Sequence, residues 1–147
     1  MKIGPALTPS AREICFAIRR AVFIEEQGIA EAEEWDDLDT VATHFLCWDN
    51  DGPAATARLM VRDDVVKIGR VAVLIDRRGA GLGLKLMRAM LRVGKEKGCR
   101  AAELDSQIYA MPFYERIGFV AEGPEFDDAG IPHRKMVRSL APIPSLV

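Results

Sequence analysis

The chain has 147 residues, 49% of them hydrophobic and 29% charged, and its net charge at pH 7 is −2. This length suits one domain, expected over 1–147, and the composition is that of a folded globular protein. The small acidic charge disfavours nucleic acid as a partner, and no apolar run reaches the roughly 18 residues of a membrane helix. The first residues lack the apolar segment of a signal peptide, so we expect a cytoplasmic protein that binds no membrane.

Hydrophobic periodicity and turn residues predict the secondary structure in chain order. A capping box of Ser10 and Glu13 is expected to open a first helix that runs to about Glu26. The acidic stretch 27–40 is expected to be a loop or a short irregular helix. The remaining predicted elements are strands at 41–48, 54–61 and 65–74, a helix at 84–97, a strand at 100–104, a helix at 110–117, a strand at 119–121, a turn-rich stretch at 122–132 and a strand at 133–140. This order predicts an α/β (α+β) domain with a mixed, mostly antiparallel sheet flanked by helices.

Three cysteines, Cys15, Cys47 and Cys99, are widely spaced, and no cluster of cysteine and histidine has the spacing of metal ligands. Each of them falls in or beside an apolar segment. We therefore expect small buried thiols and no metal site.

The most informative segment is a glycine-rich turn, Arg78-Gly79-Ala80-Gly81-Leu82-Gly83, between a predicted strand and the predicted long helix. Such a turn leaves free backbone N–H groups at the helix N-terminus, where they and the helix dipole favour an anion, usually a phosphate. The P-loop pattern does not fit, because Lys85 lies between two leucines. The dinucleotide fingerprint does not fit either, because Leu84 stands where its third glycine belongs. What remains is R-x-x-G-x-G.

A second motif follows about thirty residues later, in Phe113-Tyr114-Glu115-Arg116-Ile117-Gly118-Phe119. A packed helix capped by Gly118 explains every residue of it except Tyr114. Together the two motifs resemble those of the GNAT superfamily of acetyl-CoA-dependent N-acetyltransferases, in which the second reads (F/L)-Y-x-x-x-G-F. The segments 18–28 and 34–39 are similar to the ElaA-like or YjcF-like subgroup. The resemblance extends over most of the chain.

The resemblance implies that acetyl-CoA lies in a V-shaped gap where two central strands splay apart. Its pyrophosphate would bind the glycine turn, and its pantetheine arm would bind the backbone of the preceding strand, which would also polarise the thioester carbonyl. Gln107 stands where the family commonly has Asn, and the resemblance implies that it contacts the arm. The cofactor-binding residues implied are Val71, Ala72, Val73, Arg78, Gly79, Ala80, Gly81, Leu82, Gly83 and Gln107.

Acetyl transfer to an amine needs two proton transfers. A lysine-like amine with a pKa of ~10.4 is mostly protonated at pH 7, so a base with a pKa near 6–7 would assist its attack, and the leaving thiolate must be protonated. The family match implies Tyr114 as the general acid. His133, on the last predicted strand, is our candidate for the base, because some superfamily members place theirs there. His44 or a carboxylate (Glu26, Glu103 or Asp105) acting through water are alternatives.

Eight carboxylates and no basic residue lie between Glu25 and Asp39. This segment is either a solvated loop or a rim of the acceptor pocket that attracts a cationic amine. Within the resemblance, Glu26 and His44 are expected on the acceptor side, as substrate-binding residues. His44 has an equally good interpretation as a structural histidine bonded to a backbone carbonyl.

The expected function is acetyl-CoA-dependent N-acetylation of a primary amine of a small molecule or peptide, by direct attack. The principal alternative is a non-catalytic module of the same fold that senses acyl-CoA or serves as a partner domain. A protein that binds phosphate through the glycine turn alone is a further alternative, which gives Tyr114 no role. The sequence does not identify the acceptor amine, and the frequent dimers of the family leave a homodimer open.

Overall fold

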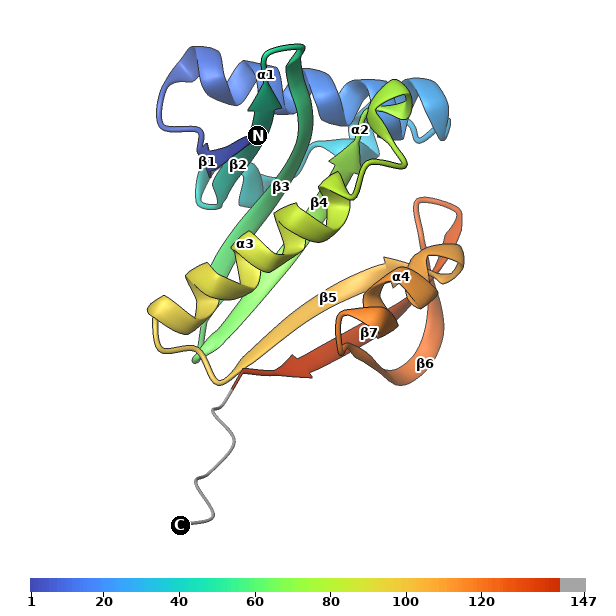
Figure 1. Cartoon of the computed structure of the whole chain (residues 1–147). Coiled ribbons are helices and arrows are strands. Elements are labelled where there is room, and N and C mark those ends of the chain that lie inside the picture. Colours follow the sequence, from blue (N-terminus) through green and yellow to red (C-terminus); the bar gives the residue numbers. More distant parts are fainter. Residues whose placement is uncertain (141–147) are drawn as a thin grey trace.

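Seven strands form one mixed sheet, in the order β1-β2-β3-β4-β5-β7-β6 (Figure 1). The computed structural model describes residues 1–140; the end of the expected 1–147 domain, 141–147, lies outside this range. The strands are β1 (Lys2–Pro5), β2 (Thr43–Asp49), β3 (Gly52–Arg62), β4 (Val65–Val73), β5 (Ala101–Gln107), β6 (Val120–Asp128) and β7 (Ile131–Ser139). The helices are α1 (Pro9–Arg19), the π-helix η1 (Arg20–Glu26), α2 (Glu31–Glu34), α3 (Leu82–Glu96), α4 (Met111–Arg116) and the short 3₁₀ helices η2 (Asp37–Thr40), η3 (Ile75–Arg77) and η4 (Ile108–Ala110). This α+β architecture confirms the expected fold class.

Two hydrophobic clusters lie between the sheet and the helices that cover its two faces. One cluster packs α3 and α4 against one face of the sheet, with Leu86, Met87 and Met90 fully buried. The other packs α1 and η1 against the opposite face, through residues such as Ile18 and Val22. The sheet is therefore covered on both sides (Figure 1). The three cysteines are free and buried, as expected.

The first helix differs from its prediction in its start and in its winding, while its end at Glu26 agrees. Its N-cap is Thr8, whose Oγ1 accepts a hydrogen bond from Ala11 N at 3.1 Å, and Pro9 occupies the first turn. The expected capping box of Ser10 and Glu13 is wrong, because Thr8 and Pro9 supply a start two residues earlier. After Arg19 the helix widens into the π-helix η1, a change of winding that hydrophobic periodicity does not reveal.

The strands agree with their predictions except at the sheet edges. The four-residue β1 was not predicted, because it is too short to show alternation. The prediction of a turn-rich stretch at 122–132 is wrong for the most part, because β6 extends through this stretch to Asp128. Gly123 has a φ of +78°, and the pairing of β6 with β7 shifts between Glu122 and Phe126. This irregularity interrupts the two-residue period by which a strand is recognised.

The parallel strands β4 and β5 separate soon after they meet. They pair only from Val65–Ala101 to Lys67–Glu103. Beyond that point β4 keeps its antiparallel pairing with β3 alone, while β5 pairs with β7 (Figure 1). Each strand therefore has backbone groups without a partner strand on its inner edge, and such groups bind a ligand or water.

Within residues 1–140, no helix is long and apolar enough to cross a membrane, and no group of three potential metal ligands comes together.

Candidate active site

A cleft of about 770 Å³ occupies the gap between β4 and β5. Most residues predicted for the cofactor and for catalysis line it, although they come from four separate parts of the chain. Those lining it are Val71, Ala72, Val73, Arg78, Gly79, Gly81, Leu82, Gly83, Gln107, Tyr114 and His133. Ala80, Glu26 and His44 do not line it.

The glycine turn forms one wall of the cleft and leads into α3. Gly79 and Gly81 have φ angles of +86° and +76°, a region that only glycine enters without strain. Gly81 is the N-cap of α3, and the first helical hydrogen bond runs from Lys85 N to Gly81 O at 3.1 Å. The N–H groups of 82–84 therefore have no partner within the helix, as an anion site requires.

Arg78 is held by an ion pair rather than left free. Its guanidinium donates to both carboxylate oxygens of Glu26, at 2.7 and 2.6 Å, and its Nε donates to Val73 O at 2.9 Å. The hydrogen bonds from Arg78 lower the pKa of Glu26. Glu26, expected on the acceptor side, thus contacts the first residue of the glycine turn.

The next residue, Gln27, contacts the opposite side of the gap. Its Oε1 accepts a hydrogen bond from Gln107 Nε2 at 2.8 Å, and its Nε2 donates to the Tyr109 hydroxyl at 3.4 Å. Glu26 and Gln27 together therefore connect the loop after β4 to the end of β5. The sequence analysis gave Gln27 no role, although this residue lies in the segment 18–28 that carries the resemblance.

Tyr114 lies on α4 with only 9% of its surface exposed. Its ring meets those of Phe113 and Phe119 edge to face, at centroid distances of 5.0 and 6.0 Å. Burial raises the pKa of its hydroxyl well above the ordinary value. The phenol is therefore neutral at physiological pH and keeps a proton to donate into the cleft.

His133 lies on β7, opposite Gln107 of β5. Its Nδ1 lies 2.7 Å from Ile131 O, and its ring stacks on Phe126 at 5.8 Å. Because a carbonyl only accepts, Nδ1 carries the hydrogen, and Nε2 of the neutral ring is left as the basic nitrogen. Asp105 is nearby; partial burial and the charge of Glu103 raise the pKa of its carboxyl, which stays open to solvent.

His44 lies apart from these residues, on β2. Its Nε2 is 2.9 Å from Asp39 O, and its ring contacts Phe16 edge to face at 5.0 Å. It is 2% exposed, and Nδ1 has no hydrogen-bond partner among the residues described. It borders a second, shallower pocket with Phe16 and Trp35. The geometry matches the structural interpretation of this histidine.

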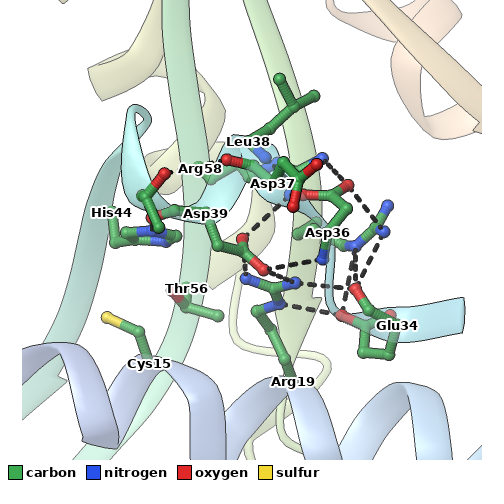
Figure 2. A network of polar contacts seen from close by, with 12 residues as sticks. Cys15, Arg19, Glu34, Asp36, Asp37, Leu38, Asp39, His44, Thr56 and Arg58 are labelled. Carbon is green, nitrogen blue, oxygen red and sulfur yellow. Dashed lines mark hydrogen bonds and ion pairs between the residues drawn. The ribbon is translucent and has the colours of Figure 1, made fainter. Parts of the chain in front are cut away.

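The acidic segment is more than a solvated loop, because five of its eight carboxylates are paired with arginines from elsewhere in the chain. Three of the five belong to one network (Figure 2), and Glu33 and Glu34 line the cleft. The six residues of this network are Arg19, Glu34, Asp36, Asp39, Arg58 and Arg70. The sequence analysis missed the three arginines, since each lies 15 to 36 positions from a carboxylate that it binds.

Burial and pairing act in opposite directions on these carboxyls. Burial raises the pKa of Asp39, but hydrogen bonds and charge from Arg19 and Arg58 outweigh it and lower that pKa to about 2. For Glu34, 2% exposed, burial prevails and the pKa is raised despite Arg19 and Arg70.

A sheet that opens between two parallel strands, beside a glycine turn at a helix N-terminus, places unpaired backbone groups and an anion site along one cleft. The family model described as "Acetyltransferase (GNAT) domain" matches residues 17–140. The chain belongs to the GNAT family of acetyltransferases.

Named relatives agree with this assignment. A Bacillus subtilis protein named "Uncharacterized N-acetyltransferase YjcF" is 35% identical over 124 residues, 84% of this chain and 89% of its own. The crystal structure of Escherichia coli ElaA has a TM-score of 0.82 and 29% identity, covering 93% of this chain and 98% of its own. An acyl-CoA N-acyltransferase from Pseudomonas aeruginosa has a TM-score of 0.84 and 28% identity, covering 94% of this chain and 99% of its own. The resemblance to the ElaA and YjcF kind is thereby confirmed.

Proposed function

We propose that this protein transfers an acetyl group from acetyl-CoA to a primary amine by direct attack, with Tyr114 as the general acid. The observation that carries the proposal is one cleft lined by the glycine turn, by the free edge of β4 and by Tyr114. The orphaned N–H groups at 82–84 suit a pyrophosphate, and the free backbone of 71–73 suits the amides of a pantetheine arm. The residues present therefore fit acetyl-CoA.

Two side chains of this protein, Tyr114 and His133, carry out the proton transfers in this proposal. The neutral amine nitrogen bonds to the thioester carbonyl carbon, and collapse of the tetrahedral adduct breaks the C–S bond. Tyr114 then donates its proton to the departing sulfur. The adduct nitrogen loses its extra proton as the amide forms, and this proton returns the Tyr114 phenolate to the neutral phenol through solvent. Burial keeps this phenol protonated until a thiolate forms, and the same apolar surroundings raise the proton affinity of the sulfur.

His133 accepts the proton of the amine in this proposal. Deprotonating a lysine-like amine at pH 7 costs on the order of 4–5 kcal/mol, about three pKa units, so a base with a pKa near 7 speeds the reaction. Nε2 of His133 is available because Nδ1 bonds Ile131 O. Asp105 and Glu103 are the alternative bases on the same side of the cleft.

The test of the general acid is Tyr114→Phe. We expect kcat to fall by about 10²-fold while the Kd for acetyl-CoA stays unchanged, the loss expected for one proton donor. Tyr109→Phe is the matched control: it removes a tyrosine hydroxyl from the exposed rim, and we expect its kcat to change by less than about threefold. Turnover at the wild-type rate in Tyr114→Phe would exclude the role.

The test of the base is the pH profile of His133→Ala. We expect a lower rate and the loss, from the pH profile, of the step that the proton acceptor contributes. A lower rate with an unchanged profile would transfer the role to Asp105 or Glu103.

The alternative function is a sensor that binds acyl-CoA without turnover. Thiol release from acetyl-CoA, measured against polyamines, amino acids, amino sugars and peptide N-termini, separates the two. Release with one class of amine identifies the acceptor. A raised Tm with acetyl-CoA, but no release with any amine, supports the sensor. A cytoplasmic location and a homodimer remain predictions; sedimentation of the intact chain tests the second.

A further inference from the structure

The strand that forms one wall of the cleft contains a strained bulge. In the β3–β4 ladder Arg58 pairs with Gly69 and Thr56 with Ala72, so one residue of β3 stands opposite both Arg70 and Val71 of β4. Arg70 has a φ of +52°. A residue with a side chain rarely adopts this conformation, and the conformation persists only where the surrounding structure enforces it.

Hydrogen bonds and ion pairs of the Arg70 side chain enforce this backbone conformation. Its Nε and Nη2 donate to the backbone carbonyl of Glu34, at 3.3 and 3.0 Å. Its Nε also lies 3.1 Å from Glu34 Oε2, and its Nη2 lies 3.4 Å from Asp36 Oδ2. The strained residue is therefore bonded to the segment 34–39, which runs from the end of α2 into η2. Its two partners there, Glu34 and Asp36, lie 36 and 34 positions earlier in the chain.

That segment is itself fixed from two other elements (Figure 2). Arg19, on α1, donates to Glu34 Oε2 at 2.8 Å and to Asp39 Oδ1 at 2.6 Å. Arg58, on β3, donates to both oxygens of Asp36, at 2.7 and 2.9 Å. The network contains three arginines and three carboxylates, so its formal charges balance. A balanced, largely buried network specifies geometry more than it adds stability.

The bulge needs this support because the sheet holds it on one side only. Pairing with β5 ends at Lys67, so the segment 69–73 is held by β3 alone on one side and faces the cleft on the other. This is the backbone that, in the function proposed above, bonds the pantetheine arm and the thioester carbonyl. Displacing such donors by about 1 Å costs as much as 10²-fold in rate.

We propose that Arg70 is a positioning residue: its bonds to Glu34 and Asp36 fix the bulge of β4 so that the backbone of 71–73 meets the acyl group. This inference rests on the proposed function. It assigns a purpose to the arginine–carboxylate network, which lies outside the catalytic groups.

The decisive variant is Arg70→Gly. Glycine adopts a φ of +52° without strain, so this change removes the tether while it relieves the backbone. We expect kcat to fall by about 10- to 100-fold when the amine identified by thiol release is saturating. The Kd for acetyl-CoA should stay within about threefold of the wild-type value, because the glycine turn is unchanged. Added methylguanidinium should restore part of kcat. Glu31→Gln, which breaks the exposed pair of Glu31 with Arg20 on the same segment, is the control and should behave as wild type.

Three results would overturn the proposal. Arg70→Gly with wild-type kcat means that the bulge needs no tether. A loss of rate that saturating amine restores means that Arg70 binds the acceptor instead. A rate loss that methylguanidinium does not reverse, together with a proportional loss of acetyl-CoA affinity, means general damage to the fold.

Amide hydrogen exchange separates this proposal from the proposed function, because it needs no turnover. Peptides that cover 68–74 should exchange about tenfold faster in Arg70→Gly than in wild type, while peptides from α3 should not change. If the wild type acetylates no amine and these peptides still exchange faster, the proposed function fails and the tether stands. Unchanged exchange at 68–74 contradicts the tether whatever the activity.

Discussion

Replacing Asp39 with asparagine should lower the free energy of unfolding in a way that depends on pH. The Asp39 carboxylate is 12% exposed and accepts hydrogen bonds from Arg19 Nη1 at 2.6 Å and Arg58 Nη1 at 2.9 Å. Its pKa is lowered from 3.8 to about 2 in the folded protein. Because one pKa unit corresponds to about 1.4 kcal/mol, the shift corresponds to about 2 kcal/mol, or 1–2 after allowance for its solvent-facing edge.

The lowered pKa of Asp39 determines how its contribution to stability changes with pH. A carboxyl with a lower pKa in the folded state stabilises the fold fully above its unfolded pKa, near 4, and loses that contribution as pH falls toward 2. Urea unfolding of wild type and Asp39→Asn should therefore differ by about 1–2 kcal/mol at pH 5–7 and by about half of that at pH 3.

The control for this series is Asp37→Asn, an exposed carboxylate in the same 3₁₀ turn with no ion pair among the described residues. It should change the free energy of unfolding by less than about 0.5 kcal/mol at every pH. A difference between wild type and Asp39→Asn that is the same at pH 3 and pH 7 would refute the assignment of the low pKa to this network.

Three further changes test the packing and the cofactor site. Gly94→Ala should lower stability by about 1–3 kcal/mol in thermal unfolding, because its Cβ would lie 2.7 Å from Val66 Cγ1; an unchanged Tm would contradict this. Gly81→Ala, at a φ of +76°, should cost about 1–2 kcal/mol and weaken acetyl-CoA binding in calorimetry. Glu26→Gln should tighten acetyl-CoA binding about two- to fivefold by freeing Arg78; weaker binding would mean that Glu26 orients Arg78 for the phosphate.

The cofactor side of the site was predictable because its signals are local. A glycine that must adopt positive φ, such as Gly81, and a helix that starts directly after it are visible within a few residues of sequence. The same holds for Tyr114 and Gly118, which share one short helix and its end. For these residues, knowing the local conformation was enough to expect where they would lie, and the cleft contains the turn and the tyrosine together.

The acceptor side was harder to predict because its residues depend on contacts between distant segments. His44 and His133 are the only two histidines of the chain and are both on strands, yet one borders the cleft and the other is buried elsewhere. Glu26 was expected near the acceptor, but a bidentate pair binds it to Arg78, 52 positions later. Sequence spacing contains no information about which of two similar side chains meets a given partner.

Residue order alone predicted the class of fold and the glycine turn, since both depend on backbone preferences or periodicity over a few residues, while the family was predicted from the resemblance of two motifs. The folded chain was needed to reveal that the acidic segment is an internal network, that the first helix widens into a π-helix and that β4 carries a strained bulge at Arg70. The network and the tether of the bulge arise from pairing between residues as many as 36 positions apart, where burial and charge, rather than local conformation, decide which groups meet.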